Sequence, residues 1–309
     1  MEHSSDTSKE SDLKLKIGKL LGKEITEFSL QGKGYCNNAY LVRTSDGAKY
    51  IVKEARSDKA FHPQNDLQAE AKVAQQLYSL GLSVPTPHVV FVSEHPKMYG
   101  YEYIEGEMLM DLWGALSEDE RIQICTALGY FHAEIGKKFT KGMAEATGIK
   151  INDSAGLHPE VAEEYEKVFA SADVPEEFKD LAKQAKLIFD TTTGDTVFQF
   201  IHNDSHHENI LIKDRRIAGI IDFGEAEYGE VAKEFSRYIR DFPEHFQYIV
   251  STYEEGSGNK LSRKRLVSTA FLSGLPDIIE DYRKGGQDCV NAEASVATYR
   301  KLISALDLI

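Results

Sequence analysis

Two short polar motifs joined by an apolar hairpin place the strongest constraint on what this chain can fold into. The first motif is His202-Asn-Asp204-Ser-His-His-Glu-Asn209, and the second is Asp222-Phe-Gly224. Between them, the segment ILIKDRRIAGII is an apolar run interrupted by a polar turn, which predicts two short antiparallel strands. We expect the carboxylate at 204, the amide at 209 and the carboxylate at 222 to converge around one divalent cation.

These residue types supply what phosphoryl transfer needs. Asp204 can orient an attacking hydroxyl and accept its proton, while Asn209 and Asp222 can hold magnesium on nucleotide phosphates. Magnesium favours hard oxygen ligands and usually takes only one or two protein carboxylates besides the phosphates. Asp, Asn and Gly are also common in turns, so either motif alone would be equally well explained by turn chemistry. The joint order and spacing of the two motifs favour the catalytic interpretation.

The same interpretation requires a lysine on the third strand and a helix carboxylate that holds it. Lys53 ends the apolar segment KYIVK, and Glu70 lies in the helical segment DLQAEAKVAQQL. Alone, the first would be interpreted as a solvated strand end and the second as an exposed helix position. Gly32 and Gly34 lie between the first two expected strands, where glycine lets backbone amides approach phosphate but also forms simple turns.

The distribution of apolar residues divides the chain into a tail and two lobes. Residues 1–11 have little to bury and are expected to be a disordered tail. Residues 12–103 are expected to form a nucleotide-binding lobe of mostly antiparallel strands with one main helix. Residues 104–309 are expected to be a helical catalytic and substrate lobe, which contains a capping box at Ser117 and Glu120. The predicted fold class is therefore α+β, with a small antiparallel β N-lobe and a larger, mostly helical C-lobe.

Charge and cysteine content narrow the possible partners and compartments. The 36 Lys and Arg residues against 50 Asp and Glu residues give a net charge of −14, which disfavours nucleic acid as a partner. The three cysteines lie far apart without a CxxC pair, as is typical of a protein in a reducing cytoplasm. Apolar stretches fall far short of the ~20 residues that cross a bilayer, so neither membrane insertion nor export is expected.

The order of glycine loop, lysine strand, helix glutamate, HNDxxxxN and IDFG resembles the aminoglycoside phosphotransferase family. This family consists of small-molecule kinases with a bilobal, protein-kinase-like fold, and the resemblance covers nearly the whole chain. It implies that Asp204 is the catalytic base and that Asn209 and Asp222 bind Mg²⁺. It also implies that Lys53 contacts the α- and β-phosphates of ATP or GTP and that Glu70 is its ion-pair partner.

The segment YEYIEGE resembles the hinge of the family, which implies that backbone groups of Glu102 and Ile104 meet the edge of the base. Tyr101 resembles the gatekeeper position, where a bulky side chain narrows the purine pocket and makes GTP a possible donor besides ATP. Protein kinases are less similar, because this chain has HND in place of HRD and no APE segment after DFG.

The family often has aspartate at three positions where this chain carries the one-methylene-longer Glu225, Glu230 and Glu234. These lie in residues 225–255, which contain eight acidic and three basic residues, and residues 159–190 contain nine acidic and four basic residues. Acidic segments beside the active cleft would attract a small cationic hydroxylated substrate, but such runs are also common on solvated surfaces.

The sequence and this resemblance therefore predict a cytoplasmic kinase that phosphorylates a small cationic compound, with an aminoglycoside as first candidate. The resemblance associates such a kinase with antibiotic resistance, but the sequence leaves its biological role open. Choline, macrolide and sugar kinases share the implied fold and remain alternatives. A nucleotide-binding pseudokinase is a further alternative, although degenerate kinases usually lose one of the motif residues retained here. We expect a monomer, with a dimer as the alternative.

Overall fold

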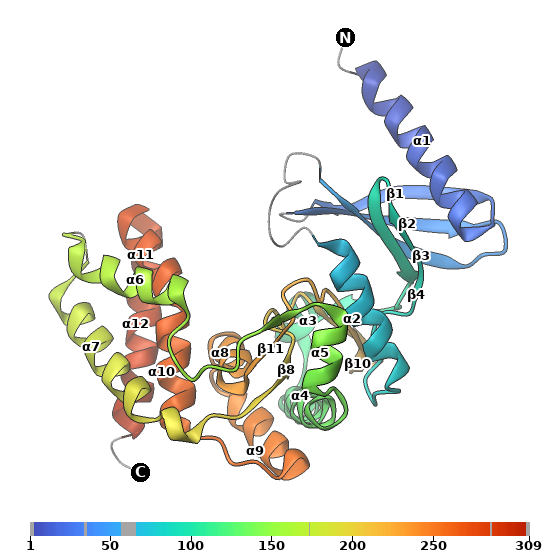
Figure 1. The fold of residues 1–309 in the computed structure, drawn as a ribbon. Coiled ribbons are helices and arrows are strands. Elements are labelled where there is room, and N and C mark those ends of the chain that lie inside the picture. Colours follow the sequence, from blue (N-terminus) through green and yellow to red (C-terminus); the bar gives the residue numbers. More distant parts are fainter. Residues whose placement is uncertain (1–2, 34–35, 57–65, 173, 285, 307–309) are drawn as a thin grey trace. The chain divides into compact units, whose positions relative to one another are not determined.

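The computed structural model describes residues 3–33, 36–56, 66–172, 174–284 and 286–306. The chain forms two compact units (Figure 1). The first unit comprises Met1–Gly114, Glu145–Ile149 and Glu208–Ala226, and the second comprises Ala115–Ala144, Lys150–His207 and Glu227–Ile309. The segment from Glu208 thus groups with the first unit, although the sequence assigned it to the second lobe. One reason is that Ile220 N–H donates to the carbonyl of Pro85 at 3.0 Å.

The first unit is built on a five-stranded antiparallel sheet in the order β1-β2-β3-β5-β4. Its strands are β1 (Ile25–Lys33), β2 (Asn37–Thr44), β3 (Lys49–Ala55), β4 (Val89–Glu94) and β5 (Lys97–Glu102). Helices α1 (His3–Leu21) and α2 (Leu67–Ser79) pack against different apolar clusters of this sheet. Ile17 of α1 packs in a cluster with Val52, and Ala71 of α2 packs in a cluster with Tyr99.

Helix α2 begins and ends where the sequence pattern predicts. The Asp66 side chain accepts hydrogen bonds from the N–H groups of Gln68 and Ala69, which satisfies donors that have no partner inside the helix. Shortly after the helix, Gly81 adopts φ +56°, a conformation that glycine tolerates without strain. The helix expected in the segment DLQAEAKVAQQL is therefore confirmed, and it continues to Ser79.

A second small sheet completes the first unit. It has the order β10-β9-β6 and comprises β6 (Glu107–Met108), β9 (Ile210–Lys213) and β10 (Arg216–Ile220). Strands β9 and β10 pair antiparallel across a turn in which Asp214 and Arg215 both have positive φ. This is the hairpin that the sequence predicts between the two polar motifs. The short helices α3 (Leu109–Leu112) and η3 (Trp113–Ala115) follow β6.

The second unit is mainly helical, as predicted. Its helices and those at its boundary are α4 (Glu118–Lys138), α5 (Lys141–Thr147), α6 (Pro159–Ala170), α7 (Glu176–Thr191), η4 (Thr193–Asp195), α8 (Val231–Asp241), α9 (Phe246–Ser257), α10 (Arg263–Ser273), α11 (Leu275–Lys284) and α12 (Gly286–Leu306). A three-stranded sheet has the order β7-β11-β8, from β7 (Lys150–Ile151), β8 (Phe198–Ile201) and β11 (Glu227–Glu230). The predicted capping box at Ser117 and Glu120 opens α4.

The structure differs from the sequence prediction at the N-terminus. The helical backbone of α1 extends back to His3, over most of the segment expected to be a disordered tail. Glu10 and Lys14, and likewise Asp12 and Lys16, are spaced four residues apart with the acid first, which favours a helix. Among the described residues, no helix combines the length and apolarity needed to cross a membrane.

Gly100 in β5 provides a test of how the first sheet packs. A Cβ atom built on Gly100 would lie 2.3 Å from Cε1 of Phe91, whereas one on Gly32 in β1 would meet nothing within 4 Å. We expect Gly100→Ala to lower the free energy of unfolding by about 1–3 kcal/mol, because the Phe91 ring must shift in a packed core. Gly32→Ala is the matched control and should change it little. Urea unfolding measures the free energy of unfolding of both variants. If Gly100→Ala has the same value as the wild type, the packing of Gly100 against Phe91 described here is contradicted.

Candidate active site

Lys53 of β3 is the central charged group of the first unit. Its side chain is only 9% exposed, and its Nζ lies 2.7 Å from Oε1 of Glu70 on α2. The same Nζ lies 2.8 Å from Oδ1 of Asp222, which follows β10. Three of the residues singled out from the sequence are therefore brought together, although the third is 169 positions from the first.

The local structure explains why these groups meet. Side chains alternate between the two faces of a strand, so Ile51 and Lys53 share the face of β3 that packs against α2. Glu70 lies in the first turn of α2 and is buried beside Leu67 and Ala71. Burial lowers the pKa of the Lys53 ammonium, but the charges of Asp222 and Glu70 outweigh it and raise the pKa above its usual value. Lys53 therefore stays protonated.

Asp222 and Asn209 supply the oxygen atoms that suit magnesium. Asp222 has φ +66°, an uncommon conformation for a residue with a side chain, and its side chain is 45% exposed. The backbone links the two residues, because Ile221 N–H donates to the carbonyl of Asn209 at 3.0 Å. No cluster of three or more His, Cys, Asp or Glu residues that could hold a metal occurs in the described part of the chain. One amide and one carboxylate fit an ion whose remaining ligands are phosphates and water.

The expected hinge residues follow β5. Tyr101 is buried in the cluster beneath α2, and its ring stacks on that of Tyr99 at a centroid distance of 5.9 Å. Glu102 N–H donates to the carbonyl of His88 at 3.0 Å, so it is already engaged. Within the described part of the chain the Ile104 N–H donates no hydrogen bond, which suits the donor role expected from the sequence.

The expected glycine loop is only partly described. Gly32 is exposed near the end of β1, and a side chain there would meet no neighbour within 4 Å. Gly34 lies outside the described residues. Their expected contact with phosphates stays a prediction.

The loop that carries Asp204 belongs to the second unit and follows β8. A buried carboxylate, Glu234 of α8, holds it: Asn203 N–H donates to Glu234 Oε2 at 2.8 Å, and the Ser205 hydroxyl donates to Oε1. Asn203 has φ +63°, in the left-handed region that asparagine tolerates better than most residues. A buried carboxylate needs such donors, so Glu234 and the loop stabilise each other.

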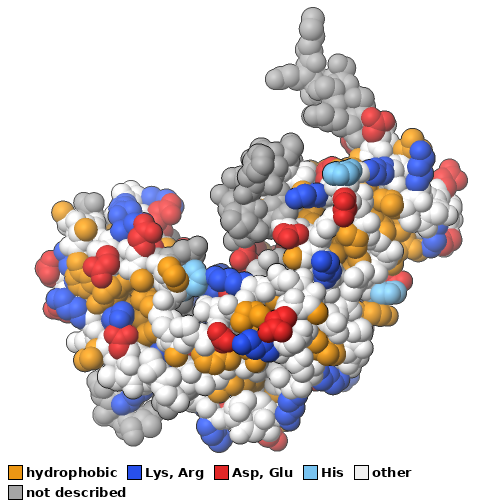
Figure 2. Space-filling model, viewed as in Figure 1, with side chains coloured by type: hydrophobic (Ala, Val, Ile, Leu, Met, Phe, Trp, Pro, Cys, Tyr) orange, Lys and Arg blue, Asp and Glu red, His pale blue; other side chains and the backbone are white. Residues whose placement is uncertain are grey.

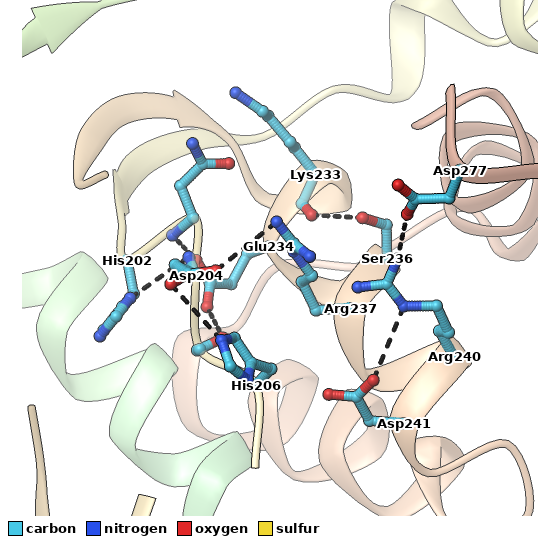
Figure 3. A network of polar contacts seen from close by, with 12 residues as sticks. His202, Asp204, His206, Lys233, Glu234, Ser236, Arg237, Arg240, Asp241 and Asp277 are labelled. Atoms are coloured by element: carbon cyan, nitrogen blue, oxygen red, sulfur yellow. Dashed lines mark hydrogen bonds and ion pairs between the residues drawn. The ribbon is translucent and has the colours of Figure 1, made fainter. Parts of the chain in front are cut away.

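Two basic side chains flank the Asp204 carboxylate (Figure 3). Arg237 Nη2 lies 3.5 Å from Oδ1, and His206 Nε2 lies 3.5 Å from Oδ2. Arg237 follows Glu234 by three positions, so both side chains lie on one face of α8. Sequence reasoning missed Arg237, whose signal is this spacing from an acidic residue.

The acidic residues after DFG are mostly engaged within the second unit. Glu230 is buried and pairs with Arg265 of α10, whose Nε lies 2.6 Å from Oε1. Glu227 is buried and pairs with Lys233 at 2.9 Å. On the face seen in Figure 2, acidic and basic side chains are intermingled. The excess of acidic residues in the sequence therefore does not by itself indicate a site for a cation.

Comparison with known proteins identifies the family of this chain. The model of the "Phosphotransferase enzyme family" matches residues 27–260, which is most of the chain. The chain belongs to this family. It is therefore a small-molecule kinase of the phosphotransferase type, and the resemblance recognised in its sequence is confirmed. A comparison with curated protein sequences finds no significant match.

Solved structures of phosphotransferases share the fold. Macrolide 2'-phosphotransferase type I has a TM-score of 0.69 at 15% identity, covering 93% of this chain and 96% of that one. The GDP complex of wild-type aminoglycoside 2'-phosphotransferase-IIIa has a TM-score of 0.67 at 16% identity, covering 94% and 99%. The GDP and kanamycin complex of APH(2")-IIIa has a TM-score of 0.64 at 19% identity, covering 92% and 93%. The predicted fold class is thereby confirmed.

His132 of α4 links the Asp204 loop to the core of the second unit. Its Nε2 lies 2.6 Å from the Tyr238 hydroxyl and 3.7 Å from Glu234 Oε1. Burial lowers the pKa of His132 from its usual 6.5 to about 4. The folded protein therefore keeps this histidine neutral at pH values where the unfolded chain binds a proton.

We expect this histidine to make the protein sensitive to acid. Stability that is fully present above pH 6.5 falls as the pH drops toward 4, because only the unfolded state gains the proton, and the loss amounts to about 3 kcal/mol. Urea unfolding across this range should give a steeper pH dependence for the wild type than for His132→Gln, which cannot titrate. Parallel profiles for the two proteins would contradict the assignment.

Proposed function

We propose that this protein transfers the γ-phosphoryl group of ATP or GTP to a hydroxyl of a small molecule. The observation that carries the proposal is the buried Lys53, paired with both Glu70 and Asp222. An ammonium held rigidly by two carboxylates keeps its charge and still has a third N–H to offer to a phosphate oxygen. In this proposal residues 12–103 act as the nucleotide-binding lobe and residues 104–309 as the catalytic and substrate lobe.

The roles of the other residues follow from their chemistry. Asp204 orients the acceptor hydroxyl and accepts its proton, while Glu234 keeps the Asp204 loop in place through Asn203 and Ser205. Asn209 and Asp222 hold Mg²⁺, which neutralises charge on the phosphates when bound. Lys53 contacts the α- and β-phosphates, and catalysis comes chiefly from positioning and charge neutralisation.

The donor nucleotide would be held at the hinge. The Ile104 N–H and the Glu102 carbonyl are the backbone groups proposed to meet the purine edge. The buried ring of Tyr101 narrows the space behind it, which is why GTP is proposed alongside ATP. The GDP complexes of the structurally similar enzymes support a guanine nucleotide as a donor worth testing.

The first candidate acceptor is an aminoglycoside, a small cationic hydroxylated compound. It is supported by the family resemblance and by structurally similar enzymes solved as complexes with kanamycin, gentamicin and streptomycin. A macrolide is the second candidate, supported by macrolide phosphotransferases with the same fold. Phosphorylation of either antibiotic by a cytoplasmic enzyme would confer resistance.

The base proposed at position 204 can be tested with an isosteric variant. Asp204→Asn should lower phosphoryl transfer about a thousandfold and leave nucleotide affinity nearly unchanged, because it removes the proton acceptor and keeps the residues proposed to hold the nucleotide. A coupled assay with ATP and with GTP, run over aminoglycosides, macrolides, choline and amino-sugars, measures the transfer. The matched control is Asp153→Asn, which alters an exposed carboxylate paired with Lys141.

Two outcomes of this assay would change the proposal. Near-normal transfer by Asp204→Asn would remove Asp204 from the role of base. Nucleotide binding by the wild type without transfer to any acceptor in the panel would favour the alternative of a pseudokinase that binds nucleotide and acts through a protein contact.

A further inference from the structure

The Glu70 carboxylate receives a second donor that the motifs do not include. The hydroxyl of Tyr99 donates to Glu70 Oε1 at 2.8 Å, and the Lys53 ammonium donates to the same oxygen at 2.7 Å. All three side chains are buried. One oxygen atom therefore accepts one neutral and one charged hydrogen bond, away from water.

The sheet fixes the position of the Tyr99 hydroxyl. Tyr99 on β5 is the direct cross-strand partner of Lys53 on β3, so the two side chains extend from neighbouring positions on the same face of the sheet. The Tyr99 ring is packed in the cluster with Leu67 and Ala71 of α2. A phenol ring has only two side-chain torsions, so packing the ring also places its hydroxyl.

The Tyr99 hydroxyl affects the position of Lys53 because the Lys53 ammonium is shared between two carboxylates, those of Glu70 and Asp222. In the proposed site Asp222 also binds magnesium, and an oxygen ligand of a divalent cation attracts a neighbouring ammonium less strongly. Glu70 must then hold Lys53 in place. Without the Tyr99 hydroxyl, Lys53 would be the only hydrogen-bond donor to the Glu70 side chain among the described residues, and this buried carboxylate could rotate about its last torsion.

We propose that Tyr99 is a positioning residue for the nucleotide: its hydroxyl fixes Glu70, and Glu70 in turn fixes the Lys53 ammonium against the phosphates. This inference rests on the proposed function, because it assumes that the first unit binds a nucleoside triphosphate. Tyr99 itself touches neither the nucleotide nor the acceptor in this proposal. It acts through Glu70.

The test is a double-mutant cycle on nucleotide affinity, measured by titration calorimetry with Mg-ATP and Mg-GTP and by displacement titration where binding is weak. Tyr99→Phe keeps the packed ring and removes the hydroxyl, and it should weaken nucleotide binding about tenfold. In a Glu70→Gln background, Tyr99→Phe should weaken nucleotide binding less than about twofold. The reason is that the Glu70 carboxylate, which the Tyr99 hydroxyl positions, is already absent.

The matched control is Tyr40→Phe in β2 of the same sheet. The Tyr40 hydroxyl also donates to a carboxylate, Glu54 Oε2 at 3.1 Å, but this pair lies outside the proposed site. Tyr40→Phe should leave nucleotide affinity unchanged. It therefore separates loss of the Tyr99 hydrogen bond from a general effect of removing a tyrosine hydroxyl.

Each remaining outcome decides between the proposals. An unchanged affinity in Tyr99→Phe, or an equal loss in the wild-type and Glu70→Gln backgrounds, would overturn the role of Tyr99 while leaving the proposed function intact. If the wild type binds neither nucleotide, the proposed function fails, and the role of Tyr99 fails with it.

Discussion

Burial of the Lys53 ammonium is the constraint on which the first unit depends. An ammonium taken out of water is stable only beside negative charge, and here that charge comes from Glu70 of α2 and Asp222 after β10. Strand, helix and hairpin are far apart in the sequence, so the unit can bury this lysine only when all three are in place. The same arrangement fixes the Lys53 ammonium where a phosphate group is expected. The contacts that stabilise the first unit are therefore also those proposed to bind the nucleotide.

The second unit uses a buried carboxylate in an analogous way. Glu234 is fully buried and is satisfied by a backbone N–H and a hydroxyl of the Asp204 loop, so the loop cannot move without leaving the carboxylate unpaired. The buried Glu230 carboxylate likewise forms an ion pair with the guanidinium of Arg265. The carboxylates of Glu234 and Glu230 therefore stabilise the second unit rather than attract a substrate. The basic side chains of Arg237 and His206 lie beside the Asp204 carboxylate itself.

The sequence predicts well what local chemistry determines. The helix that carries Glu70 has its cap and its glycine after the end, and the hairpin between the motifs has its apolar strands and polar turn, so both were predicted correctly. Strand β11 was missed, because its sequence EYGE is acidic and contains glycine, and it forms only through pairing with β8 and β7. Tyr99 was missed for a related reason, because its contact with Glu70 is a tertiary contact that no spacing along the chain reveals. Arg237 was missed although its spacing of three residues from Glu234 was visible in the sequence.

A crystal structure with magnesium and a non-hydrolysable ATP or GTP analogue tests the central claim most directly. The account predicts that Lys53 Nζ, still paired with Glu70, lies within hydrogen-bond distance of an α- or β-phosphate oxygen. It also predicts that the side-chain oxygens of Asn209 and Asp222 coordinate the metal. A triphosphate bound elsewhere, or one bound here while Lys53 points away from it, would contradict the account.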